Sequence, residues 1–354
     1  MTRRRVPISW FRLGDDPGLA RFLDGMARRN GGRVLAVSGD RLGDYVVTDY
    51  VRARLARAGA PDAALFAPAA IDRIAASPLR RPDPWLHLIG TKIWLDGGML
   101  TGSAYMVKPW GRNDNYGIRD DTYRGVLNVP GDRLRAMIRR VAGHGMQFTA
   151  HTVGDGASEE LLAAYADIAR ELPLRDLRPS ISHSNFMTSE TVAAAARLGV
   201  VMDIQPIWLY LDTRTLVAQF GYERLRWFQP LHSILAAGGV AGGGSDHMLK
   251  IGDLRAINPY NPFLGMWTTI TRRAKWHDGQ LHPEEALTRQ QAIEFYTRLN
   301  AQVIRWEKEI GSLEAGKRAD FIIVDRDLLE CPEDDLRATR VLETWVDGRR
   351  VHGL

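Results

Sequence analysis

The chain has 354 residues, of which 45% are hydrophobic and 25% charged, so it can bury a large core. The 47 Lys and Arg residues exceed the 42 Asp and Glu residues by a net charge of +5 that is spread along the chain. Without a concentrated basic stripe, this charge does not favour nucleic acid as a partner. The single cysteine, Cys331, excludes an intrachain disulfide and a cysteine-based zinc finger.

No apolar run approaches the length of a membrane span. The basic start of the chain is followed by an apolar stretch too short for an export signal. We therefore expect a cytoplasmic protein with no membrane partner. The sequence leaves the oligomeric state open.

Residues 1–90 show only short patterns and are expected to form an α/β segment. Strands are expected within residues 6–13 and 33–37. Helices are expected at 17–29 and 49–58.

From residue 87 onward, short apolar runs alternate with stretches of helical spacing. Each run ends at a polar residue, and the runs cover residues 87–95, 146–150, 179–182, 200–204 and 240–245. Strands that alternate with helices predict parallel strands joined by right-handed crossovers. Polar residues at the carboxyl ends of such strands are typical of a TIM-type (β/α) barrel, whose site lies at that rim. We assign this barrel to residues 91–305.

The helix ends in this region have recognisable caps. Asp155 or Ser158 is placed to begin one helix, and Thr188 or Ser189 to begin another that ends near Gly199. Thr288 and Gln291 have the spacing of a capping box ahead of a third helix.

The last part of the chain, residues 306–354, has a different pattern. Residues 321–324 and 341–346 are apolar and separated by a polar stretch, and Asp347-Gly348 predicts a turn. We expect a small C-terminal β appendage here.

Lys92, His151, His183 and Asp246 lie at the ends of four of the predicted strands. Taken singly, each is better explained by packing, capping or exposure to solvent. Taken together, two imidazoles and a carboxylate are good ligands for Zn²⁺ or a related divalent metal. A lysine buried at a barrel mouth would have a lowered pKa. Its neutral amine could then react with CO₂ to form a carbamate that binds metal.

Several motifs resemble the amidohydrolase superfamily, in particular its YtcJ-like branch (amidohydrolase family 3), which includes N-substituted formamide deformylases. They occur in the same order over roughly three-quarters of the chain, at residues 92–98 (KIWLDGG), 150–156 (AHTVGDG), 181–184 (ISHS), 244–246 (GSD) and 311–320 (GSLEAGKRAD). The resemblance implies a composite β-sandwich to which the C-terminal appendage belongs.

The resemblance also implies a role for each strand-end residue. Lys92 would be a carbamylated bridging ligand, and His151 and His183 would bind one metal. Asp246 would contact the other metal and act as general base. The reaction implied is hydrolysis of a non-peptide C–N bond in a small amide or formamide, with metal-activated water as the nucleophile.

This sequence departs from the family pattern in one important respect. The family's first strand ends in His-x-His, and this motif occurs nowhere among the nine histidines. The barrel is therefore expected to be incomplete at its N-terminus. The ligands present suffice for one divalent metal, and their types favour zinc. Two metals would require that other residues, a partner chain or a second copy replace the missing pair. The alternative is a truncated, non-catalytic remnant that keeps the fold and a partial metal site.

Four further residues are candidates for substrate binding. Asp96 follows the lysine strand, Trp208 and Tyr210 would form an aromatic wall, and His247 is adjacent to Asp246. By contrast, Trp267 and Trp276 are expected to be packing residues. A carbohydrate-active barrel with paired carboxylates has little support, because few acidic residues lie at strand ends.

Overall fold

The computed structural model describes residues 10–12, 34–36, 68–81, 83, 86–114, 116–247 and 259–353. The chain divides into two compact units, residues 1–73 and 74–354. In the first unit, β1 (Trp10–Arg12) and β2 (Val34–Ala36) pair in parallel, within the two segments expected to be strands. The boundary between the two units, after Arg73, falls within helix α3 (Pro68–Ala75). The helices expected at 17–29 and 49–58 lie outside the described residues.

The second unit is built on a five-stranded parallel sheet in which the strands are arranged in chain order. These strands are β3 (Gly90–Trp94), β4 (Gln147–Thr152), β5 (Ser180–His183), β6 (Val201–Ile204) and β7 (Val240–Gly243). All five coincide with predicted apolar runs. Parallel strands that lie side by side in chain order are arranged as consecutive strands of a barrel are. The described residues show five such strands, and closure of the barrel stays a prediction.

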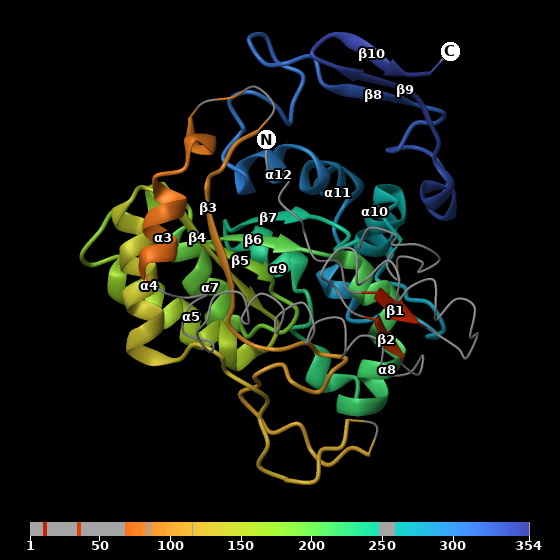
Figure 1. Cartoon of the computed structure of the whole chain (residues 1–354). Coiled ribbons are helices and arrows are strands. Elements are labelled where there is room, and N and C mark those ends of the chain that lie inside the picture. The colour runs from red at the N-terminus through yellow and green to blue at the C-terminus, as the bar shows by residue number, and fades with distance from the viewer. Residues whose placement is uncertain are drawn as a thin grey trace. The chain divides into compact units, whose positions relative to one another are not determined.

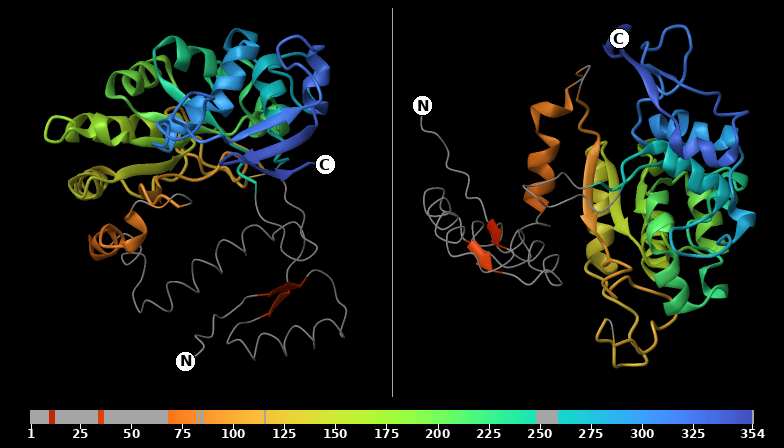
Figure 2. Two further views of the ribbon diagram at one scale, coloured as in Figure 1. Left: turned by 90° about the horizontal axis from the view of Figure 1, so that it is seen from above. Right: turned by 90° about the vertical axis from the view of Figure 1, so that its right-hand side faces the viewer.

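Helices connect consecutive strands of this sheet (Figures 1 and 2). They are α4 (Gly131–Gly143), α5 (Asp155–Ile168), α6 (Leu174–Leu177), α7 (Ser189–Leu198), α8 (Pro206–Phe220) and α9 (Leu231–Ala236). Helix α4 buries Leu134, Met137 and Val141, which lie on one face because of their spacing. Neighbouring helices α4, α5 and α7 pack against one another.

The predicted caps were confirmed for two helices and wrong for one. Thr188 caps α7, and Gly199 ends it with a φ of 69°. The Thr288 capping box begins α11 (Arg289–Tyr296). Helix α5, however, has Gly154 as its N-cap, because the Asp155 carboxylate instead accepts the N–H of Val107 at 2.7 Å.

After β7 the chain forms α10 (Pro262–Thr271), α11 and α12 (Arg298–Val303), of which α11 and α12 contact β7. Short 3-10 helices complete the unit at η2 (Pro78–Arg80), η3 (Glu223–Leu225), η4 (Pro283–Glu285) and η5 (Glu333–Ala338). None of the helices in the described ranges has the length and hydropathy that crossing a bilayer requires.

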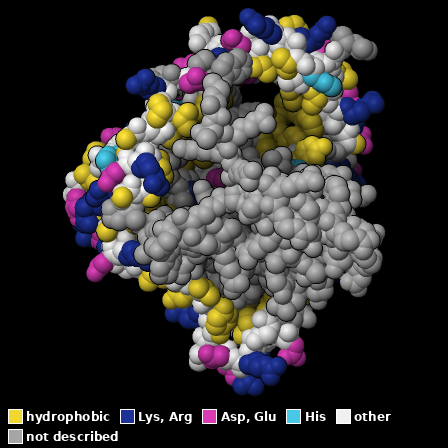
Figure 3. Space-filling model, in the orientation of Figure 1, with side chains coloured by type: hydrophobic (Ala, Val, Ile, Leu, Met, Phe, Trp, Pro, Cys, Tyr) yellow, Lys and Arg dark blue, Asp and Glu magenta, His cyan; other side chains and the backbone are white. Residues whose placement is uncertain are grey.

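The C-terminal residues form a separate antiparallel sheet of β8 (Phe321–Val324), β9 (Val341–Val346) and β10 (Arg349–His352). The first two strands were predicted, whereas β10 was not, because its sequence is mostly polar. Phe321 and Trp345 stack across β8 and β9 with ring centroids 5.5 Å apart. Ile322, Ile323 and Leu342 are nevertheless exposed, and Figure 3 shows hydrophobic side chains in the region of these strands.

The long connection between β3 and α4 forms a core of its own with α8. Met106 and Trp110 from this connection are buried together with Leu209 and Leu216 of α8. The Trp110 indole N–H donates to the Ala104 carbonyl at 2.8 Å, which satisfies its one polar atom. This packing fixes the connection beside the carboxyl ends of the strands, where the candidate site lies.

Candidate functional site

A cavity of about 170 Å³ lies at the carboxyl ends of β4 and β5. The predicted residues His151, His183, Trp208 and Asp246 all line it. Its other walls come from the β3–α4 connection, Val153 and Asn185, and its surface is almost entirely apolar. Residues far apart in the sequence therefore meet at the edge of the sheet where the sequence places the site.

Lys92 lies on β3 and extends across the sheet toward β5. Its Nζ donates to Oγ of Ser182 at 2.9 Å. The side chain is exposed, contrary to the burial expected from the sequence. The physical reason is that β3 is an edge strand of the described sheet, with β4 as its only neighbour there.

His151 and His183 form a close pair of imidazoles. Their ring centroids are 4.4 Å apart and the rings are nearly perpendicular. Burial lowers the pKa of His151 to about 3, with the positive charges of His183 and Lys92 adding to the effect. Burial and Lys92 likewise lower the pKa of His183 to about 4. Both rings are therefore neutral near pH 7, the form that binds metal.

A buried polar network, missed from the sequence, holds His183 in place. Nδ1 of His183 lies 2.6 Å from Oε1 of Gln205. Nε2 of Gln205 donates to the Asp203 carbonyl oxygen and to its Oδ1, each at 3.0 Å. Oδ2 of Asp203 accepts from Ser182, the hydroxyl that Lys92 also contacts. The one sign of this network in the sequence was Asp203, a single acidic residue inside the apolar run that forms β6.

Asp246 lies three residues beyond the end of β7 and has a φ of 50°. Partial burial raises the pKa of its carboxyl group. The charge of Lys92 and a hydrogen bond from the Trp208 side chain oppose this shift, and the charge of Asp203 adds to it. The carboxylate is thus within electrostatic range of the lysine on the opposite strand of the sheet.

Asp96 is completely buried behind the cavity rather than in its lining. Oδ1 accepts the N–H of Val153 at 2.9 Å, and Oδ2 accepts those of Gly154 and Tyr105 at 2.8 and 3.0 Å. Burial raises the pKa of Asp96 to about 7, while these N–H groups oppose the shift. Gly154 is required here because a Cβ would lie 2.0 Å from the Tyr105 carbonyl oxygen. This geometry favours a supporting role over substrate contact.

The remaining candidates lie outside the cavity lining. Tyr210 contacts Trp267, with ring centroids 6.2 Å apart, and His247 contacts Tyr260 at 4.7 Å. Trp267 is buried, as predicted, but Trp276 is 64% exposed, so its assignment as a packing residue was wrong. Lys275 lies over the Trp276 ring at 3.9 Å, a surface cation–π contact that sequence spacing does not reveal.

Across the described ranges, no three side chains drawn from His, Cys, Asp and Glu are grouped closely enough to hold a metal ion. His151, His183 and Asp246 are three side chains of these types, so the described structure does not gather them closely enough to hold a metal ion by themselves.

The profile of the amidohydrolase family matches residues 24–352. The chain belongs to this family. It is 25% identical over 272 residues to the amidohydrolase-like protein YtcJ of Bacillus subtilis, an alignment that covers 76% of this chain and 48% of YtcJ. It is 29% identical over 211 residues to the N-substituted formamide deformylase of Arthrobacter pascens, covering 59% of this chain and 37% of that enzyme. The chain thus spans about half the length, or less, of these curated relatives.

Among solved structures, a metal-dependent hydrolase from Pyrococcus horikoshii has a similar fold, with a TM-score of 0.62 and 20% identity. The superposition covers 92% of this chain and 57% of that protein. A related hydrolase from Pyrococcus furiosus gives a TM-score of 0.59 with 21% identity. These similarities support the parallel α/β architecture of the family.

Proposed function

We propose that the chain carries the catalytic centre of a metal-dependent hydrolase that cleaves the C–N bond of a small, non-peptide amide. One observation carries this proposal: two neutral imidazoles and a carboxylate line an apolar cavity at the carboxyl ends of parallel strands. The Lys92 amine lies outside the lining, where it donates to Ser182 on the same strand as His183. Family membership supports the reaction class.

The residues at the cavity fit a divalent metal in their chemistry. If Nδ1 of His183 donates to Gln205, the lone pair of its Nε2 is free for a metal. His151 is neutral for the reasons given above. In this proposal Lys92, as a CO₂-derived carbamate, joins the two histidines and Asp246 as ligands, with zinc as the first metal to test.

A bound divalent ion would polarise the substrate carbonyl and lower the pKa of a water molecule. Asp246, as general base, would take a proton from the attacking water and pass it to the leaving amine. The Trp208 hydrogen bond stabilises the ionised form of Asp246, which is the form that accepts a proton.

The cavity also indicates a class of substrate. Met99, Leu100, Val153 and Trp208 present apolar surface beside the histidines. An amide with an apolar substituent on nitrogen would bury that group here, whereas a charged substituent would lose its hydration without a partner. The printed name of the Arthrobacter relative, an N-substituted formamide deformylase, supports a formamide as the first compound to test.

The test is elemental analysis of the purified chain after equilibration with zinc and bicarbonate. The Lys92→Ala variant is measured beside it, with Lys108→Ala, an exposed lysine outside the cavity, as the control. We expect about one metal per chain in the wild type and the control, and a loss of metal in Lys92→Ala. Equal metal content in Lys92→Ala and the wild type would refute the carbamate assignment.

Hydrolysis is then assayed with N-benzylformamide and with formamide itself. We expect turnover to favour the benzyl compound and to require Lys92. A folded wild-type chain that binds no metal and hydrolyses neither compound would contradict the proposal and support the non-catalytic alternative.

A further inference from the structure

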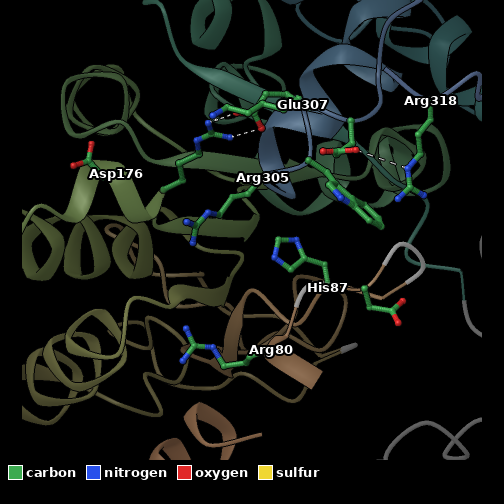
Figure 4. Close-up of a pocket in the computed structure, with 11 residues that line it drawn as sticks. Arg80, His87, Asp176, Arg305, Glu307 and Arg318 are labelled. Carbon is green, nitrogen blue, oxygen red and sulfur yellow. Dashed lines mark hydrogen bonds and ion pairs between the residues drawn. The ribbon is translucent and has the colours of Figure 1, made fainter. Parts of the chain in front are cut away.

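A second and larger cavity, of about 650 Å³, lies at the opposite end of the parallel sheet (Figure 4). His87, in its lining, precedes β3, and Arg178 lies just before β5. These are the amino ends of the strands, whereas the candidate metal site lies at their carboxyl ends. The two cavities share no lining residue.

Two arginines that line this cavity, Arg305 and Arg80, form no ion pair with a carboxylate among the described residues. Within the described part of the chain, the guanidinium of Arg305 makes no hydrogen bond or ion pair, although it is half-buried. Arg80 donates to the carbonyl oxygens of Ala75 and His144, at 3.2 and 3.1 Å, and forms no ion pair with another described residue. Figure 4 shows the two side chains directed toward the same side of the cavity, one from above and one from below.

Most of the neighbouring acidic groups already have other partners. Glu307 forms an ion pair with Arg178, and Glu309 lies 4.0 Å from Arg318. Asp83 accepts the N–H of Leu86 at 3.0 Å. Asp176 also lines the cavity but forms no ion pair with either Arg305 or Arg80.

The backbone at Arg305 is also unusual for this residue type. Helix α12 ends in a Schellman motif, in which Trp306 N–H donates to the Ala301 carbonyl and Arg305 N–H to that of Gln302. Arg305 occupies the left-handed position with a φ of 60°, where glycine is strongly preferred. An arginine is therefore present at a backbone position that does not favour it. Burial lowers its pKa, the charges of Arg178 and Arg80 add to this shift, and the charge of Glu307 opposes it.

Aromatic rings form another wall of the cavity. The His87 and Trp306 rings have centroids 6.0 Å apart, and Arg318 lies over the Trp306 ring at 5.5 Å. The cavity thus combines unneutralised guanidinium groups with aromatic surface. Arginine binds phosphate oxygens through two parallel N–H groups, and aromatic rings stack on one another.

We propose that this cavity binds an aromatic phosphate monoester, with the phosphate held by Arg305 and Arg80 and the aromatic group against Trp306. The site is separate from the catalytic centre and does not depend on the proposed hydrolase activity.

Isothermal titration calorimetry on the full chain tests this, with inorganic phosphate and phenyl phosphate as probes. Arg305→Gly is the informative variant, because glycine suits the left-handed backbone and its unfolding temperature should not fall. Arg119→Ala removes the same charge from an exposed site elsewhere and serves as the control. We expect Arg305→Gly to weaken both ligands at least about tenfold and Arg119→Ala to change neither.

Trp306→Leu examines the aromatic wall separately. We expect phenyl phosphate to bind about threefold or more tightly than inorganic phosphate in the wild type, and this preference to disappear in Trp306→Leu. Unchanged affinity in Arg305→Gly would overturn the proposal, because phosphate would then be bound elsewhere, the metal site included. The absence of any binding to the wild type would overturn it as well.

Discussion

Nδ1 of His183 lies 2.6 Å from Oε1 of Gln205, and this contact determines which ring nitrogen faces the cavity. The amide nitrogen of Gln205 is already committed to Asp203, so its oxygen must be the atom that faces the imidazole. An amide oxygen only accepts hydrogen bonds. Nδ1 of His183 therefore carries the proton, and Nε2 carries the lone pair.

We predict that Gln205→Ala weakens metal binding. Without the amide, the ring loses its fixed orientation and tautomer, an effect that typically costs about 10–100-fold in metal affinity. Competition with a fluorescent chelator measures this directly. Gln290→Ala, on the exposed face of α11, is the matched control and should bind metal as the wild type does. Equal affinity in both variants would show that Gln205 does not orient the ligand.

We predict that Trp208→Phe moves the acidic limb of the pH–rate profile to higher pH. The Trp208 side chain donates to Asp246 and so lowers the pKa of that carboxyl group. Phenylalanine keeps the apolar wall but cannot donate, so the pKa rises and less of the base is ionised at a given pH.

The measurement is kcat/KM for an N-substituted formamide between pH 5 and 9. Trp276→Phe, at a largely exposed position, should leave the profile in place. A profile for Trp208→Phe that coincides with the wild type would rule out Asp246 as the titrating base.

We predict that Asp96→Asn destabilises the fold by about 1–3 kcal/mol. In the variant, an amide N–H₂ group replaces one of the two carboxylate oxygens, so at least one backbone N–H now bound by Asp96 loses its acceptor. Urea unfolding measures the loss. Asp121→Asn, which removes an exposed ion pair with Arg112, should cost less than about 1 kcal/mol. A loss at Asp96 no greater than that of the control would contradict its supporting role.

Asp212 is predicted to make stability depend on pH. Its Oδ2 is buried without a hydrogen-bond partner in the described structure, and burial raises its pKa from 3.8 to about 7. Between these two values the unfolded chain has lost the proton and the folded chain has kept it. The contribution of Asp212 to stability therefore falls as pH rises from about 4 to about 7, by up to about 1.4 kcal/mol per pH unit.

Asp212→Asn removes this titration. The stability of the variant relative to the wild type should rise with pH over the same interval, as measured by urea unfolding at several pH values. Asp278→Asn, at an exposed position, provides the control. Parallel curves for Asp212→Asn and the wild type would show that Asp212 does not titrate in this range.

The main strands and the residues at their ends could be predicted from the sequence because both depend on local patterns. An apolar run followed by a polar residue predicted β4 and His151 as well as β5 and His183. Long-range relationships were less accessible. Gln205 and Asp203 acquire their role only when β5 and β6 pair, which places Ser182 beside Asp203.

Exposure was the property least well predicted. Lys92 was expected to be buried. Its burial would require a neighbouring strand on the outer side of β3, and the residue pattern within β3 does not show whether such a strand is present. Trp276 was assigned to packing from its residue type, although it lies on the surface. Asp96 was placed with the substrate because it follows a strand. Its backbone partners are Tyr105, in the same connection, and Val153 and Gly154, which only the fold brings close.

The Asp96 carboxylate has a further consequence for how this part of the molecule opens. Its three N–H donors belong to the β3–α4 connection and to the start of α5, segments far apart in the chain. If these amides are released together, the hydrogens of Tyr105, Val153 and Gly154 will exchange with deuterium at a shared rate. The histidine at the end of β4 and the apolar wall facing it would then form a single cooperative unit.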